Sequence, residues 1–207
     1  SGTRSERTGG EVTLDPFPWT PSKESWPPNY VAILAWRQKT LQLIQTDGNA
    51  YRGAMEFYRT HPVDFIQHWC STYDPRHAGK DGKLTSMPFA LFPKQVEAVH
   101  FLYDCLANER NGLIEKARDL GATWLCVAVS VHLWRFLPGA AIGWGSRKQE
   151  LVDELGITDS ILEKIRMTIR LLPKVFWPKG FDPNGHMPFM RILNPESGAS
   201  ITGETGD

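Results

Sequence analysis

The chain after residue 89 alternates short apolar runs with helical patterns, and this alternation constrains the fold most. The apolar runs Gly112–Lys116 and Ala140–Gly145 each precede helical spacing, at Ala122–Phe136 and Arg147–Leu155. Such alternation is typical of βαβ units, in which consecutive strands run parallel. Later in the chain we expect a helix over Asp159–Leu172, closed by Pro173, and strands over Phe189–Leu193 and Ala199–Thr202. The sequence therefore predicts an α/β fold with a mainly parallel sheet.

The chain before residue 89 shows helical spacing instead. Apolar residues recur at helical intervals over Tyr30–Gln45, and Asn29 is a suitable N-cap. Further helices are expected at 50–59 and 62–70, followed by a loop at 74–88 that is rich in Pro and Gly. A helix over Pro93–Asn108 begins with proline, whose missing N–H is harmless in a first turn.

These patterns divide the chain into three parts. Residues 1–28 are rich in Pro, Ser, Gly and charge but contain Trp19 and Trp26, which is typical of an extended arm that attaches by burying a ring. Residues 29–88 are expected to form a helical N-terminal subdomain, and residues 89–207 the α/β core.

Composition excludes some classes of protein and sites. The 23 Lys and Arg residues equal the 23 Asp and Glu residues, so the chain lacks the global basicity of a DNA-coating protein, although local patches remain possible. No apolar run reaches the ~18 residues that span a bilayer, and no signal pattern opens the chain. Cys70, Cys105 and Cys126 are odd in number and lack metal-ligand spacing, which favours a reducing cytoplasm. A zinc site at His68, Cys70 and His77 fits no common spacing, so we expect core or surface roles for them.

The segment Lys116–Thr123 carries the clearest chemical signal. Compared with the phosphate-loop pattern G-x-x-x-x-G-K-[ST], Gly121 and Thr123 match, Lys116 replaces the first glycine and Ala122 replaces the lysine. A phosphate there would meet the backbone N–H groups from Leu120 to Trp124 and the positive end of the helix dipole. Lys116, whose stem reaches roughly 6 Å, can supply the missing charge from the other side of the loop. Degenerate loops of this kind also occur by chance.

Two further motifs make a resemblance specific. Lys116, Arg118, Gly121 and Thr123 match the deviant phosphate loop [SK]-x-R-x-x-G-x-[ST] of tailed-phage terminase large subunits. Phe89–Gln95 resembles the adenine-recognition motif of that family, and Ala140–Lys148 resembles the strand and loop after its phosphate-loop helix. A Gln amide suits adenine because it is both donor and acceptor. The order and spacing of all three motifs agree over roughly residues 60–207.

The resemblance implies a P-loop NTPase domain of the additional-strand type, preceded by a helical subdomain. It implies hydrolysis of ATP with Mg²⁺, coupled to translocation of double-stranded DNA into a procapsid in the host cytoplasm. The implied partners are a portal protein, the small terminase subunit and further copies in a ring, with no membrane. Lys116 and Arg118 would be catalytic and Thr123 would ligate Mg²⁺. The implied nucleotide-binding residues are Phe92, Gln95, Lys116, Arg118, Asp119, Leu120, Gly121, Ala122, Thr123 and Trp124.

One departure from the family limits the expected activity. No apolar strand ends in the Asp-Glu pair that holds Mg²⁺-bound water; Glu196, Glu204 and Asp207 follow prolines and glycines instead. We therefore expect this pair beyond Asp207, no nuclease domain within the 207 residues, and negligible hydrolysis by this chain alone.

Several alternatives stay open at the level of sequence. Arg118 can act as a γ-phosphate sensor or pair with Asp119. The chain can be a superfamily-2-type helicase, although those proteins keep the lysine that Ala122 replaces, or a non-enzymatic DNA- or capsid-docking module with a vestigial loop. Two further groups of residues each have a structural and a functional interpretation. Core packing or base stacking is open for Trp124, Trp134, Trp144 and Trp177. A solvated face or a DNA contact is open for Arg147, Lys148, Arg166 and Arg170.

Overall fold

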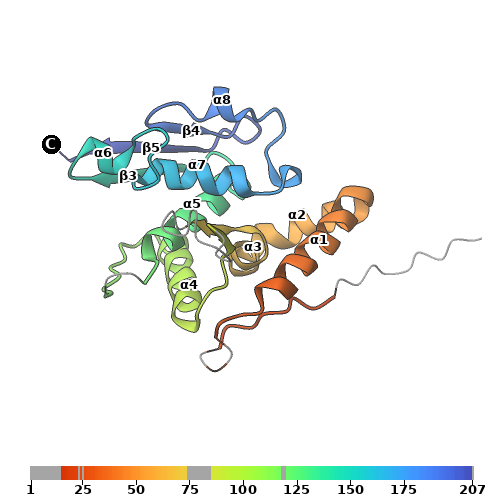
Figure 1. Ribbon diagram of the computed structural model, residues 1–207. Coiled ribbons are helices and arrows are strands. Elements are labelled where there is room, and N and C mark those ends of the chain that lie inside the picture. Colours follow the sequence, from red (N-terminus) through yellow and green to blue (C-terminus); the bar gives the residue numbers. More distant parts are fainter. Residues whose placement is uncertain (1–14, 23, 25, 74–84, 118–119, 207) are drawn as a thin grey trace, which may run out of the picture.

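The computed structural model describes residues 15–22, 24, 26–73, 85–117 and 120–206, which form a mixed α/β structure (Figure 1). The elements are α1 (Tyr30–Thr46), α2 (Gly48–Thr60), α3 (Pro62–Trp69), β1 (Ser71–Tyr73), β2 (Ser86–Pro88), α4 (Pro93–Ala107), α5 (Ala122–Phe136), β3 (Ala141–Ser146), α6 (Gln149–Val152), α7 (Ile161–Leu171), η2 (Lys174–Phe176), α8 (Pro183–His186), β4 (Arg191–Leu193) and β5 (Ser200–Thr205). The predicted α/β class is confirmed at this level.

The helices begin where local sequence signals place them. The Asn29 side chain accepts a hydrogen bond from Ala32 N at 3.0 Å, which caps α1. Asp47 caps α2 in the same way, accepting from Asn49 N and Ala50 N. Helices α3 and α4 both carry proline at the first position. The starts predicted for the helices over Tyr30–Gln45 and 50–59 thus lie within two residues of the observed starts of α1 and α2.

The three-stranded sheet is mixed, so the prediction of a mainly parallel sheet is wrong. Strand β5 lies in the middle, parallel to β3 from Ala141↔Ser200 onward and antiparallel to β4. The antiparallel pair follows from a short turn, in which Asn194 Oδ1 accepts from Glu196 N at 2.9 Å and from Ser197 N at 3.1 Å. A connection of this length joins only antiparallel neighbours, because a parallel crossover needs about a dozen residues.

The strand predicted at Gly112–Lys116 does not form. Among the described residues no strand pairs with this segment, and the Leu113 side chain is 90% exposed. The segment begins against α4, where a Cβ at Gly112 would lie 2.8 Å from Cys105 Sγ. From there the green trace between α4 and α5 extends away from the body in Figure 1. A lone strand would leave its N–H and C=O groups without a ladder, so nothing stabilises one here.

Two other boundaries differ from the prediction. The expected loop at 74–88 ends in β2, which pairs with β1 in register Ser71↔Pro88; residues 74–84 lie outside the described part. The helix expected over Arg147–Leu155 is reduced to α6, because the Asp153 side chain turns into a buried ion pair and its backbone is extended.

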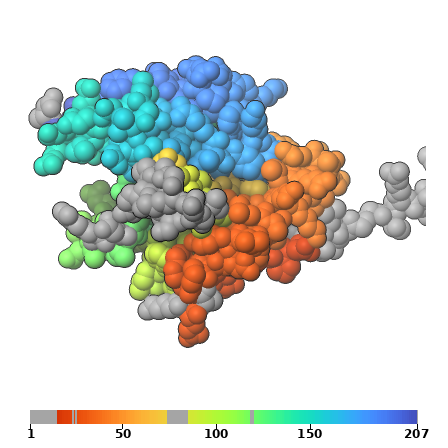
Figure 2. Space-filling model, viewed as in Figure 1, coloured from red at the N-terminus to blue at the C-terminus, as the bar shows by residue number. Residues whose placement is uncertain are grey.

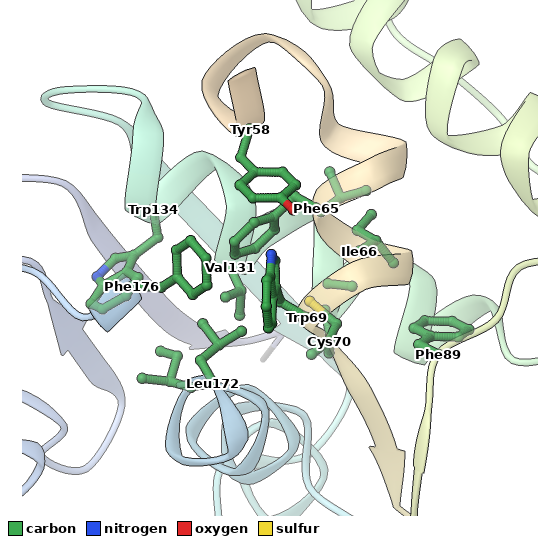
Figure 3. Packing of buried hydrophobic residues seen from close by; sticks show 14 of the residues in the cluster. Tyr58, Phe65, Ile66, Trp69, Cys70, Phe89, Val131, Trp134, Leu172 and Phe176 are labelled. Carbon is green, nitrogen blue, oxygen red and sulfur yellow. The ribbon is translucent and has the colours of Figure 1, made fainter. Parts of the chain in front are cut away.

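The core joins both predicted subdomains. Aromatic rings from α2, α3 and η2 pack together: the ring centroids of Tyr58 and Phe65 are 5.8 Å apart, and those of Trp69 and Phe176 are 4.9 Å apart (Figure 3). Trp134 of α5 is also fully buried, as expected for a core residue. Figure 2 shows the cyan-to-blue residues of the sheet layer stacked over the orange residues of the helical part. One hydrophobic cluster thus spans the chain on both sides of residue 88.

Arg166 is neither solvated nor available to DNA. Its guanidinium is fully buried and donates to both carboxylate oxygens of Asp153, at 2.5 and 2.6 Å, and to Glu163 Oε2 at 3.2 Å. Asp153 also accepts from Met190 N at 2.5 Å, so the network ties α6 and α7 to the start of β4. Arg170, on the same helix, is half-exposed and pairs with Glu163. The two bonds to Asp153, which lies in another element, account for the inward turn of Arg166.

Candidate nucleotide site

The N-cap of helix α5 is a glycine with left-handed backbone geometry. Gly121 has φ 70° and ψ 16°, a conformation that costs other residues roughly 1–2 kcal/mol. The first intrahelical bond runs from Leu125 N to Gly121 O at 2.9 Å, so the N–H groups of Ala122, Thr123 and Trp124 precede it. The first turn carries no acidic residue. This end of the helix is therefore chemically suited to an anion.

Gln95 connects the start of α4 to the loop before α5. Its amide is buried; Oε1 accepts from Phe92 N at 3.0 Å, and Nε2 donates to Leu120 O at 3.2 Å. The loop backbone approaches so closely that a Cβ at Gly121 would lie 3.3 Å from Gln95 Nε2. Since a Gln amide offers two N–H donors and two lone pairs on its oxygen, one of each remains for a ligand. The expectation that Gln95 stands ready for base recognition is compatible with this geometry.

A cavity of about 820 Å³ opens beside this contact, and we call it the aromatic cavity. Its volume lies within the range of roughly 300–1,000 Å³ of small-molecule sites. Five residues that the sequence assigned to nucleotide binding line it: Phe92, Gln95, Lys116, Leu120 and Ala122. The other lining residues are Ser22, Trp26, Pro93, Lys94, Ala98, Ile114, Glu115, Ala117, Leu125 and Cys126. Three parts of the chain that are far apart in sequence therefore meet here.

A second cavity, of about 960 Å³, lies along the same wall, and we call it the hairpin cavity. It contains two more of the predicted residues, Gly121 and Trp124, together with residues of β1, β2 and the turn before α7. Trp26, Phe92, Gln95 and Leu120 line both cavities. These four residues thus form the partition between them, and Trp124 lies on the hairpin side.

The remaining predicted residues are not gathered into either cavity. Thr123 is exposed as the second residue of α5 and lines neither one. Lys116, which lines the aromatic cavity, is itself exposed and so lies at its rim. Arg118 and Asp119 lie outside the described residues. Arg147 and Lys148 follow β3 as predicted but line neither cavity.

The two histidines near the core are structural. Burial lowers the pKa of His68 to about 3, and its Nδ1 lies 2.9 Å from Tyr58 Oη. Burial also lowers the pKa of His132 to about 4, and its Nε2 lies 2.7 Å from Tyr58 O. In the described part of the chain, no group of three or more His, Cys, Asp or Glu residues is arranged to hold a metal ion, and every helix is too short or too polar to cross a bilayer. His77 lies outside the described residues.

The sequence did not indicate that Trp26 lines the aromatic cavity. It predicted that the arm buries a ring, and Trp19 does so, but it assigned no binding role to Trp26. The only available signal was an aromatic residue in an otherwise polar, Pro-rich segment. No protein-family model matches the chain, and no curated protein matches it either.

Proposed function

We propose that the chain binds ATP at the start of α5 and in the adjoining aromatic cavity, as the nucleotide-binding core of a terminase-type DNA-packaging ATPase. The observation that supports this most is the bond from Gln95 Nε2 to Leu120 O, 3.2 Å long across 25 residues of sequence. It joins the segment interpreted as an adenine motif to the segment interpreted as a phosphate loop. Two independent sequence patterns thereby converge on one cavity.

In this proposal each residue has a defined role. The N–H groups of the first turn of α5 bind phosphate oxygens, and Lys116 neutralises the β- and γ-phosphates from the rim. Gln95 uses its remaining N–H and lone pair at the base edge. The Thr123 hydroxyl ligates Mg²⁺, an ion that commonly takes only one or two protein ligands because phosphates and water supply the rest.

The wider function rests on the resemblance of the motifs. It comprises a P-loop core of the additional-strand type that couples ATP hydrolysis to translocation of double-stranded DNA into a procapsid. A portal protein, the small terminase subunit and a ring of copies would act with it in the host cytoplasm. Hydrolysis by this chain alone is expected to be negligible, since the family's Asp-Glu pair is not found before Asp207.

One observation favours a second candidate, a non-enzymatic docking module with a vestigial loop. The segment Gly112–Lys116 forms no strand, so the loop is not braced by a sheet on that side as in an ordinary phosphate loop. Such a module would bind no nucleotide. Nucleotide binding therefore separates the two candidates.

The test is calorimetric titration of ATPγS and ADP against matched variants. Lys116→Ala should weaken ATPγS binding by about 1.5–3 kcal/mol, the range for hydrogen bonds to charged groups, and ADP binding by less. Lys116→Ala combined with Ala122→Lys should recover part of this loss, because the second position is where ordinary phosphate loops keep their lysine. Lys179→Ala, at an exposed lysine outside both cavities, is the control and should bind like the parent.

Two results would count against the proposal at different levels. Parent protein that binds neither nucleotide supports the docking module. Parent that binds ATPγS, with Lys116→Ala binding equally well, removes Lys116 from the site but leaves nucleotide binding intact. Circular dichroism of every variant confirms that a loss of affinity is not a loss of folding.

A further inference from the structure

The N-terminal arm is fixed to the body on both sides of Trp26. Upstream, the Trp19 ring is buried in a small cluster with Ile33 and Ala90, and its Nε1 donates to Leu91 O at 3.3 Å. Downstream, Asn29 caps α1. Between these two attachments, Trp26 lines both cavities. Trp26 is therefore held at the site by its neighbours along the chain.

Trp26 keeps much of its ring surface free. Its side chain is 45% exposed, although it contacts Phe92 edge to face, with ring centroids 4.7 Å apart at 68°. Trp19, in contrast, is 7% exposed and hydrogen-bonded. A tryptophan that only packs the core would be buried like Trp19, because burial of the ring is what stabilises the fold. The contact with Phe92 holds the indole in place and leaves aromatic surface facing the cavity.

We infer that Trp26 is the base-stacking residue of the nucleotide site, held in place by Phe92. This inference rests on the proposed function and names a residue outside the loop and the adenine motif. An indole face binds any nucleobase, since every base has a π-face, so it contributes affinity with little selectivity. Gln95 lies in the same wall and contributes selectivity through hydrogen bonds at the base edge. The base and the phosphates are thus recognised by different segments.

This division of roles gives each substitution its own signature. Trp26→Ala should lower the affinities for ATP, ADP and GTP by a similar factor of about 5- to 140-fold. This factor corresponds to about 1–3 kcal/mol per stacked base. It should leave binding of inorganic tripolyphosphate unchanged, because that ligand has no base. Gln95→Ala should instead reduce the preference for ATP over GTP. Lys116→Ala should lower the affinities for tripolyphosphate and for ATP alike.

Two conservative variants separate stacking from packing of the arm. Trp26→Phe keeps an aromatic face and should retain most of the ATP affinity, while the quenching of tryptophan fluorescence by ATP is lost. Trp26→Leu keeps apolar bulk without a π-face and should lose affinity like Trp26→Ala. Phe189→Ala is the matched control, because Phe189 is also 45% exposed but lines neither cavity, and it should bind like the parent.

The titrations use the full chain, with unfolding by urea measured on each variant. If Lys116→Ala weakens ATP and Trp26→Ala does not, the stacking role is wrong and nucleotide binding stands. An equal loss of tripolyphosphate binding in Trp26→Ala would show that the arm supports the loop rather than the base. If the parent binds no nucleotide, the proposed function and this inference fall together.

Discussion

Gly121 and Gly139 form a natural pair for testing the contact between the loop and Gln95. Both have φ 70°, so an alanine is strained at either position. A Cβ at Gly139 would meet nothing within 4 Å, whereas a Cβ at Gly121 would lie 3.3 Å from Gln95 Nε2. The difference between the two alanine variants therefore isolates that contact from backbone strain.

The expected magnitudes follow from these two terms. Gly139→Ala should lower the free energy of unfolding by about 1–2 kcal/mol, the cost of the left-handed conformation. Gly121→Ala should lower it by about 1.5–3.5 kcal/mol, because Gln95 must shift and its hydrogen bond to Leu120 O, worth roughly 0.5–1.5 kcal/mol, weakens in addition. Only Gly121→Ala should also weaken ATPγS binding.

Urea unfolding and ATPγS titration of both variants, repeated in a Gln95→Ala background, measure these terms. The excess loss in Gly121→Ala should disappear when Gln95 is absent, since the side chain that the new Cβ meets is then gone. Equal losses in Gly121→Ala and Gly139→Ala, with unchanged ATPγS affinity, would refute the argument that this contact organises the site. Unequal m-values would instead point to a change in the denatured state.

Three further predictions concern the body of the protein. Burial lowers the pKa values of His68 and His132 to about 3 and about 4, below their ordinary 6.5, so the unfolded chain takes up protons first as pH falls. The stability that these two histidines contribute should be complete above about pH 7 and decrease as pH falls from 6.5 towards 4; a flat profile of urea midpoints over that range would contradict this. Arg166→Met leaves the buried Asp153 carboxylate without its counter-charge, while Glu163 keeps Arg170, and should cost about 3–5 kcal/mol in urea unfolding. The half-exposed Arg170→Met should cost less than about 1 kcal/mol; similar losses would mean that the buried network is unimportant. Leu113→Asp should change the free energy of unfolding by less than about 0.5 kcal/mol, since the side chain is 90% exposed. A large loss of stability in thermal denaturation would indicate that Gly112–Lys116 pairs as a strand after all.

The helices were predictable because their signals are local. Asn29, Pro62 and Pro93 mark helix starts through side-chain or ring chemistry that acts within one turn. Strands depend on partners far along the chain. The apolar run Gly112–Lys116 reads as a strand but finds no ladder, and β1 and β2 are too short at three residues each to show a period.

The candidate site was predictable in part for the same reason. Motif spacing brought Gln95 and the loop at Leu120 into one hypothesis, and the hydrogen bond between them agrees with it. Spacing said nothing about Trp26, because a position in an irregular arm has no periodicity that indicates which way its side chain faces. It also misjudged Arg166, whose inward turn depends on Asp153 in another element.

The bond between Trp19 and Leu91 spans 72 residues, and this has a consequence for how the protein is made. The arm is synthesised before α1, α2 and α3, yet Ala90 and Leu91, the residues against which Trp19 packs, follow only after these helices. Closing so long a loop costs entropy that is recovered only when the contact forms, and non-local contacts of this kind form slowly. We therefore expect the arm, although it is synthesised before these helices, to be among the last segments to take its place. The wall containing Trp26 would then assemble only after the helical layer beneath it has folded.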